Sequence, residues 1–310
     1  MKTVSSMKTV PETADAVSAM GVTRASTPSG KLLLASLLAG LYIAVGGALA
    51  IRAGCGVPAE WGPAGRLLFA AAFPLGLLLV VFGGAALFTG DVMYVFGGMF
   101  RRKVDVPSGV KSLLLSWTGN LGGALLLVYI IHWTGILLDG GGSGGPAPMA
   151  LYTVKLGAAK CSQGFWTLFV KGILCNQLVC LAVFMALCSP SPAAKAILIW
   201  PPIFGFVALG MEHSVANMFF IPAGMLAGSD PGYLASPGAV AATYGWSDFF
   251  VKNLVPVTFG NIVGGGIFVA APYCLGLRPP QTAADQSDSA TARRPGSGSG
   301  EAGAQTARAA

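Results

Sequence analysis

Apolar residues along this chain form six long runs that are separated by short polar segments. An α-helix needs about 20 residues to cross a hydrocarbon core of about 30 Å, and each run is long enough for one crossing. Charged side chains are rare within the runs: Lys171 lies in the fourth, and Glu212 precedes His213 at the centre of the fifth. We therefore predict an all-α membrane protein with six transmembrane helices, at Leu32–Ile51, Leu67–Gly90, Ser112–Leu138, Cys161–Ser191, Ala196–Gly228 and Asn253–Leu277.

The polar ends of the chain frame one transmembrane domain, which we place at residues 31–278. Residues 1–30 form a polar arm in which Glu12–Met20 is predicted to be a short helix, packed under the bundle or resting on the membrane surface. Because this arm precedes the first apolar run, we expect no cleaved signal peptide. Residues 279–310 consist mainly of small and polar residues without apolar periodicity, so we expect a disordered tail.

Composition excludes a soluble fold. Of the 310 residues, 10% are charged and 54% are hydrophobic, whereas soluble domains have roughly 25% and 45–50%. Two histidines cannot build a multi-histidine metal centre, and the six cysteines form no C-x-x-C pair, so we expect buried free thiols and neither metal nor cofactor. The net charge of +7 is scattered between the apolar runs, which indicates membrane topology and not nucleic-acid binding.

The basic residues predict the orientation in the membrane. Six crossings place both termini on one side, and the segments on that side contain 13 Lys and Arg residues against 5 in the segments on the other side. Because basic residues accumulate on the cytoplasmic side, we expect a multi-pass protein with cytoplasmic N- and C-termini, with the plasma membrane as the expected location.

A repeated motif indicates internal symmetry. Gly119–Gly123 reads G-N-L-G-G in the third run, and Gly260–Gly264 reads G-N-I-V-G in the sixth, 141 positions later. Three crossings separate the two motifs, and an odd number of crossings inverts one half relative to the other, as in transporters with a midplane site. The alternative is that the two motifs are glycine-rich packing faces of ordinary helices.

Glu212 and His213 are the sharpest functional candidates. An ionisable pair at membrane depth persists mainly where it lines a cavity or satisfies freed backbone groups, so we expect the fifth helix to break there. Gly83–Asp91 has two glycines, a threonine and an aspartate, and predicts a matching break in the second helix. Facing breaks would form a pore, with Phe73 and Phe206 as candidate constrictions. The alternative is a structural Glu–His pair that joins two helices.

Four segments carry a resemblance to a known family. Gly210–Met218 reads G-M-E-H-S-V-A-N-M and looks like the G-x-E-H-S-x-A-N-M signature of the formate/nitrite transporter family. Leu87–Gly90 (L-F-T-G), Gly172–Cys180 (G-I-L-C-N-Q-L-V-C) and Pro256–Gly265 (P-V-T-F-G-N-I-V-G-G) resemble its motifs in the second, fourth and sixth spans. The four motifs occur in the family's order, and the resemblance covers roughly residues 10–278.

The resemblance implies an aquaporin-like inverted repeat with broken second and fifth helices. It also implies five protomers, each with its own pore for small monovalent anions such as formate, nitrite, hydrosulfide, lactate and other short monocarboxylates. By motif position, His213 resembles the family's central pore histidine and Lys160 its vestibule lysine; read alone, Lys160 would be an ordinary loop lysine. Thr89 falls in the loop that meets the histidine.

The same resemblance assigns further residues to the substrate path. It places Phe73 and Leu77 at the outer constriction, and Phe206 at one of the same two slits. Residues that we also expect along the path are Phe88, Asn176 and Asn217, and residues that we expect to support the pore are Glu212, Asn120 and Asn261.

Two positions depart from this scheme or stay outside it. Ala86 stands where many family members have an acidic residue before L-F-T, so a bracing hydrogen bond at that position is not expected. Lys171 lies within the fourth run, where it snorkels or pairs with Glu212 or Asp248, and we do not assign it to the pore.

Together these observations predict proton-coupled transport of small monocarboxylates, with lactate and formate as leading substrates. The tail and Lys160 are similar to the lactate-exporting members of apicomplexan parasites. Moving a bare carboxylate through an apolar slit costs several kcal/mol even after relaxation, whereas protonating a carboxylate of pKa about 3.9 at pH 7 costs about 4 kcal/mol. The proton would come from water in the vestibule or through His213.

Three other functions remain as alternatives. A formate- or nitrite-type anion channel without obligatory proton coupling would have the same architecture. A neutral-solute pore is disfavoured because the sequence has no Asn-Pro-Ala box. A membrane enzyme is not expected, since two histidines and few acidic residues build no nucleophile–base pair.

Overall fold

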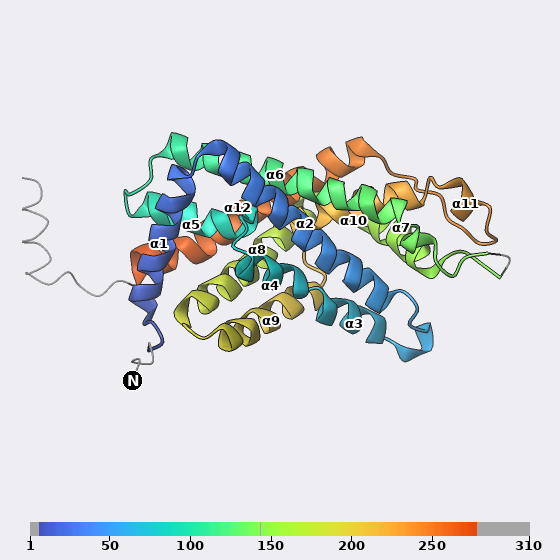
Figure 1. Cartoon of the computed structure of the whole chain (residues 1–310), viewed down its shortest axis with the longest axis horizontal. Coiled ribbons are helices and arrows are strands. Elements are labelled where there is room, and N and C mark those ends of the chain that lie inside the picture. The colour runs from blue at the N-terminus through green and yellow to red at the C-terminus, as the bar shows by residue number, and fades with distance from the viewer. Residues whose placement is uncertain (1–5, 143, 278–310) are drawn as a thin grey trace, which may run out of the picture. The chain divides into compact units, whose positions relative to one another are not determined.

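The computed structural model describes residues 6–142 and 144–277, and this part of the chain is built from helices and their connections (Figure 1). The all-α prediction is confirmed. By length and apolar composition, five helices of the described chain could each cross a membrane: Ser29–Gly54 (α2), Ala64–Phe82 (α3 and α4), Val106–Trp133 (α6), Phe165–Cys188 (α8) and Asp248–Gly276 (η3, α12, η4 and η5). The predicted tail, 279–310, lies outside the described residues.

The fifth predicted run does not form one long helix. It is divided between Pro192–Ala208 (α9) and Ser214–Ala227 (α10), with Leu209–His213 between them in a non-helical conformation. The second run is interrupted as well. Its helix consists of Ala64–Ala72 (α3) and Leu75–Phe82 (α4) and ends at Gly83, so Phe88–Gly90 belong to the next helix, Phe88–Phe100 (α5).

Both interruptions begin with the same glycine-ended helix terminus. Gly84 has φ of +66° and Gly210 has φ of +70°, a left-handed conformation that side chains disfavour. The amide of the following residue then reaches back to the helix, from Ala85 to the Val80 carbonyl and from Met211 to the Phe206 carbonyl, both at 3.0 Å. This is the usual geometry in which glycine ends a helix and satisfies its last carbonyls.

The long helices pair through glycine. α2 lies along α6, and α8 lies along the last helix, Val255–Gly265 (α12) (Figure 1). A Cβ at Gly123 of α6 would overlap the Leu37 carbonyl of α2, and one at Gly264 of α12 would overlap the Ile173 carbonyl of α8. Close backbone contact of this kind drives helix association where both helices are surrounded by apolar lipid.

Two further helices lie outside the predicted runs. The N-terminal helix is longer than predicted, Val10–Ser26 (α1), and begins with a capping box in which Thr9 and Glu12 satisfy each other's backbone amides. It packs against α5. Pro148–Cys161 (α7) was not predicted because its apolar residues are interrupted by Lys155 and Lys160; it packs against α10.

The remaining described elements are short, and they lie either in the connections between these helices or, for η3, η4 and η5, within the helix Asp248–Gly276. They are the 3-10 turns Ala59–Trp61 (η1) and Ile136–Leu138 (η2), the helical turn Pro231–Leu234 (α11), and the π-helical segments Asp248–Leu254 (η3), Gly266–Ala270 (η4) and Pro272–Gly276 (η5).

A comparison of neighbouring glycines tests the helix pairing. Gly123→Ala is expected to lower the melting temperature in detergent, because the new methyl group would overlap the Leu37 carbonyl. Gly122→Ala is the control, since no atom lies within 4 Å of a Cβ there, and the better helix former should leave stability unchanged or slightly higher. Equal melting temperatures for the two variants would contradict the close contact of α2 with α6.

Candidate functional site

An asparagine side chain holds the non-helical segment between α4 and α5. Asn120 of α6 donates from Nδ2 to the Ala86 carbonyl at 2.9 Å and to the Ser36 carbonyl at 2.7 Å. Its Oδ1 accepts the Phe88 amide at 2.8 Å. The Ala86 amide donates to the Ala35 carbonyl of α2 at 3.1 Å. Backbone groups that a continuous helix would satisfy are therefore satisfied by one buried side chain and by a neighbouring helix.

Asn261 makes the same set of bonds at the segment between α9 and α10. Its Nδ2 donates to the Glu212 carbonyl at 3.0 Å and to the Gly172 carbonyl at 2.8 Å, and its Oδ1 accepts the Ser214 amide at 2.9 Å. The Glu212 amide donates to the Lys171 carbonyl of α8 at 3.4 Å. Each asparagine thus brackets an interruption by binding the residues on both sides of one position, Leu87 or His213.

His213 occupies the bracketed position of the second interruption and contacts the first. Its Nε2 lies 3.0 Å from Oγ1 of Thr89, at the start of α5, and its side chain is 3% exposed. Its Nδ1 accepts the Ala216 amide at 3.1 Å and so caps α10. Because Nδ1 is an acceptor here, the proton of the neutral ring is on Nε2, and His213 donates to the threonine hydroxyl.

Thr89 is fixed from behind by α8. Its carbonyl accepts from Nδ2 of Asn176 at 3.1 Å and from the Cys180 thiol at 3.3 Å. Asn176 also donates to the Asn261 carbonyl at 2.7 Å, so one amide links the two halves of the site. All four side chains are buried.

A buried ion pair braces the same region from α7. Nζ of Lys160 lies 3.1 Å and 3.0 Å from the two carboxylate oxygens of Glu212. Glu212 also accepts from Nδ2 of Asn217 at 2.6 Å, and that amide donates to Asn253 at 2.7 Å. Nδ2 of Asn253 donates to the Lys160 carbonyl at 2.9 Å, so Lys160, Glu212, Asn217 and Asn253 form a closed ring of hydrogen bonds. Lys160 is therefore paired, and the expectation that Lys171 pairs with Glu212 was wrong.

Lys171 instead faces solvent-accessible space on the same side. Its Nζ donates to Oε1 of Gln163 at 2.7 Å, while Asp248 pairs with Lys252. Lys171 and Lys160 both line a cavity of about 260 Å³, which we call the Lys160 cavity. The charged residues of its wall are three basic and one acidic: Arg66, Lys160, Lys171 and Glu212.

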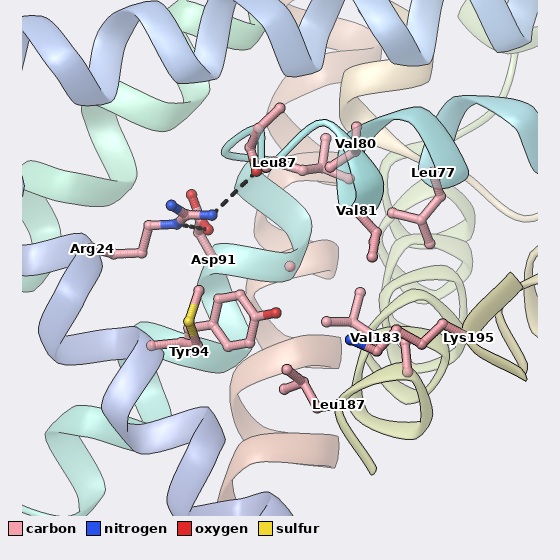
Figure 2. A pocket seen from close by; sticks show the side chains of 15 residues that line it. Arg24, Leu77, Val80, Val81, Leu87, Asp91, Tyr94, Val183, Leu187 and Lys195 are labelled. Carbon is pink, nitrogen blue, oxygen red and sulfur yellow. Dashed lines mark hydrogen bonds and ion pairs between the residues drawn. The ribbon is translucent and has the colours of Figure 1, made fainter. Parts of the chain in front are cut away.

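A second cavity, of about 240 Å³, lies beside α1 and is called the Arg24 cavity (Figure 2). Nε of Arg24 lies 2.7 Å from Asp91, and its guanidinium also donates to the Ala85 carbonyl at 3.2 Å. The second oxygen of Asp91 accepts from Ser116 at 2.8 Å. Lys195 is the remaining charged residue of the lining, which thus has two basic groups and one acidic group.

The two cavities lie at opposite ends of the same helices. Lys171 of α8 lines the Lys160 cavity, and Val183, 12 residues later, lines the Arg24 cavity. At 1.5 Å per residue the two positions are about 18 Å apart along α8. On α9, Phe206 lines the Lys160 cavity and Lys195 the Arg24 cavity, about 16 Å apart by the same rise. The cavities are therefore arranged in series.

Aromatic side chains and His213 close the Lys160 cavity at its inner end. The rings of Phe73 and Phe206 meet edge to face at 5.9 Å, and Phe206 stacks on His213 at 5.9 Å. Phe220 lies 6.0 Å from Phe73 and beneath the Lys160 amine at 5.6 Å. We call the rings of Phe73, Phe206 and Phe220 the apolar wall, beside which His213 meets Thr89.

The predicted site residues are distributed unequally. Phe73, Phe206, Lys160, His213 and Asn217 line the Lys160 cavity. Leu77, which was predicted at the same constriction as Phe73, lines the Arg24 cavity.

The other predicted path residues line neither cavity. Phe88, Thr89 and Asn176 are buried, and Thr89 reaches His213 between the cavities. The backbone amide of Phe88 binds Asn120. Asn120 and Asn261, which were predicted to support the pore, bind the backbone of the two interruptions.

Three contributors were missed. Phe220 lies on the same face of α10 as Ala216 and Asn217, because residues three and four positions apart share a helix face. A search along that face would have identified Phe220 as a residue of the cavity. Arg24 and Asn253 had no signal in the sequence, because their partners are 67 and 36 positions away. Within the described ranges, no group of three or more His, Cys, Asp or Glu residues could hold a metal ion.

The ion pair makes a testable prediction about stability. Lys160→Met is expected to destabilise the fold by about 3–5 kcal/mol, because it leaves the buried Glu212 carboxylate without its partner. Adding Glu212→Gln to this variant should recover most of the lost stability. Lys252→Met removes a partner from the exposed pair with Asp248 and should leave the melting temperature in detergent nearly unchanged. No recovery in the double variant would contradict the bracing role.

Comparison with known proteins agrees with the resemblance in the motifs. The family model described as "Formate/nitrite transporter" matches residues 11–275. The chain is 41% identical over 284 residues to a probable formate transporter of Methanothermobacter thermautotrophicus, covering 87% of this chain and 97% of that protein. It is 33% identical to the formate channel FocA of Escherichia coli K12, covering 82% and 88%.

A solved structure leads to the same assignment. The pentameric formate channel with formate bound superimposes with a TM-score of 0.71 at 32% identity, covering 80% of this chain and 96% of that one. The sequence match, the motifs and the fold therefore agree, and the chain belongs to the formate/nitrite transporter family.

Proposed function

We propose that the protein transports small monocarboxylates, with formate as the leading substrate, along a path from one cavity to the other past His213. The observation that carries this proposal is the pair of net-positive cavities arranged in series and separated by an apolar wall. Positive cavities concentrate anions, while an apolar wall admits only what has lost its charge.

Proton coupling follows from the cost of crossing that wall. A carboxylate leaves water at a cost of several kcal/mol even after relaxation, whereas adding a proton at pH 7 costs about 4 kcal/mol for a carboxyl of pKa about 3.9. We propose that the substrate takes a proton from water in the cavity, crosses as the neutral acid and releases the proton on the far side. Each substrate molecule then moves together with one proton.

His213 and Thr89 are proposed to guide the neutral acid through the wall. The Nε2 proton of His213, held by the Thr89 hydroxyl in this structure, is the only ring proton that a passing carboxyl oxygen could use, since Nδ1 caps α10. Asn217 lines the Lys160 cavity, and its buried Oδ1 has no hydrogen-bond partner among the described residues. Lys160 acts mainly through Glu212, because its charge is already paired.

We propose that α9 and α10 together make a sixth crossing and that the domain is an inverted repeat. Gly84, Ala86 and Phe88 correspond to Gly210, Glu212 and Ser214 at a constant spacing of 126 positions, with the same hydrogen bonds. Arg24 of α1 and Lys160 of α7 are also alike in that each pairs with an acidic residue, Asp91 and Glu212 respectively. These correspondences support broken second and fifth crossings that meet near the midplane.

The assembly and topology complete the proposal. A pentamer is supported by the solved relative, which is described as a pentameric formate channel. The excess of basic residues on one side supports cytoplasmic termini, with 1–30 as a cytoplasmic arm and 279–310 as a cytoplasmic tail, and the plasma membrane as the location. Under this topology the Arg24 cavity opens to the cytoplasm, because α1 belongs to the arm.

Two finer questions divide the candidate functions. The relatives named for formate favour formate over lactate, although both acids are small enough for cavities of about 240 and 260 Å³. The relative named as a formate channel supports a second candidate, an anion channel without obligatory proton coupling.

Uptake into proteoliposomes tests transport and coupling together. With an inward proton gradient, labelled formate should enter several times faster than without one and should accumulate above the external concentration, because the neutral acid increases tenfold per pH unit. A proton ionophore should abolish the accumulation. Nitrite, acetate, lactate and pyruvate, measured at two external pH values, define the substrate range. Formate uptake at the same rate with and without the proton gradient would support the anion channel instead.

The contact between the two interruptions makes a second prediction. Thr89→Val keeps the shape of the side chain but removes the hydroxyl that binds His213, and formate uptake should fall by about tenfold, the value of one hydrogen bond of about 1.4 kcal/mol. Thr89→Ser should retain most of the activity. Thr118→Val is the matched control, since that exposed hydroxyl binds only carbonyls of its own helix. Wild-type uptake in Thr89→Val would remove this contact from the mechanism.

A further inference from the structure

Lys195 is a charged group of the Arg24 cavity that neither the fold nor the proposed mechanism uses. It lies in the first turns of α9, and its side chain extends from that helix toward the middle of the cavity (Figure 2). Among the residues that the structure describes, no hydrogen bond or ion pair is formed by its amine. Its backbone amide donates to the Ser191 carbonyl.

The other charges of this cavity cancel each other. Nε of Arg24 binds one oxygen of Asp91 at 2.7 Å, and its NH2 group binds the Ala85 carbonyl at 3.2 Å. The titratable groups that face the space are these two, Tyr94 and Lys195. The formal charge of +1 is therefore located on Lys195, and Arg24 is held against the wall as part of the scaffold.

The surroundings of Lys195 make its charge effective. The rest of the wall is largely aliphatic, from Val80, Val81, Leu87, Val183 and Leu187. A charge in a small space with such walls acts more strongly on a counter-ion than the same charge on an open surface, because the walls do not screen it. The chemistry of the space thus fits one small monovalent anion and the water around it.

We propose that Lys195 is the anion-binding group of the Arg24 cavity and holds the carboxylate of the substrate before it enters, or after it leaves, the apolar wall. This inference rests on the proposed function and adds a residue that determines affinity. It also separates the two basic residues by role: Arg24 braces the segment 83–87, whereas Lys195 binds the passing anion.

Position within the repeat supports this separation. Arg24 and Lys160 are alike in that each is paired with an acidic residue, so both belong to the scaffold that the two halves share. Lys195 corresponds at a spacing of 126 positions to Phe69, so its charge has no counterpart in the other half. A residue that is partly exposed and unpaired is also one that the fold tolerates losing.

Equilibrium exchange of labelled formate in proteoliposomes tests the assignment. The formate concentration is the same inside and outside the vesicles, so both cavities are exposed to the same concentration. The orientation of the protein in the vesicle therefore does not matter. In about 10 mM salt, where charges act over roughly 30 Å, Lys195→Gln should raise the half-saturating formate concentration about threefold to fivefold. In about 1 M salt, charges act over roughly 3 Å, and the half-saturating concentration of Lys195→Gln should equal that of the unaltered protein. The saturating exchange rate should stay the same.

Two further variants make the result specific. Lys195→Arg keeps the charge and should keep the low-salt affinity. Lys155→Gln removes the same charge from an exposed position of α7 that lines neither cavity, and should exchange formate like the unaltered protein.

Each other outcome overturns a stated part of the argument. An unchanged half-saturating concentration in Lys195→Gln at low salt, or a loss that is equal at both salt concentrations, would overturn the role of Lys195 while leaving formate transport intact. Absence of exchange in the unaltered protein would overturn the proposed function, and this inference with it.

Discussion

Two asparagine side chains solve the main physical problem of this fold, which is non-helical backbone inside an apolar bundle. An unsatisfied backbone amide or carbonyl costs several kcal/mol in hydrocarbon, so a helix can be interrupted there only if another group takes its hydrogen bonds. Asn120 and Asn261 each provide two donor bonds and one acceptor bond to an interruption and its neighbouring helix. The positions of Thr89 and His213, and hence the contact between them, depend on these six bonds.

The glycines place the asparagines at the required distance. Asn120 reaches the α2 backbone because Gly123 and Gly119 bring α6 close to α2, and Asn261 reaches α8 because Gly260 and Gly264 do the same for α12. A larger residue at these positions would separate the helices and lengthen the bonds to Ser36 and Gly172. Tight helix packing and the geometry of the two interruptions are therefore one requirement and not two.

Local pattern predicted the parts of this site that depend on local sequence. The apolar runs and the glycines near 84 and 210 are visible in the chain, and so helices long enough to cross a membrane, and both interruptions, could be anticipated. Which cavity a residue lines was harder to predict. Leu77 is four residues from Phe73, yet Leu77 lines the Arg24 cavity and Phe73 lines the Lys160 cavity. Pairing was not predictable at all, because Lys160 of α7, Glu212 of the non-helical segment and Asn253 of η3 meet only through the fold.

The chemistry of the site lies where the two halves differ. The bonds that hold the interruptions are the same in both, yet Leu87 occupies the bracketed position of one and His213 that of the other. Likewise, Ala86 stands where the second half has Glu212, whose carboxylate pairs with Lys160 and orders Asn217. If the residue at the second bracketed position were also apolar, two apolar side chains would occupy the two bracketed positions. Replacing one of them with an imidazole adds a single hydrogen-bond donor to the apolar wall, and the adjacent glutamate supplies the acceptor that keeps the nearby lysine paired.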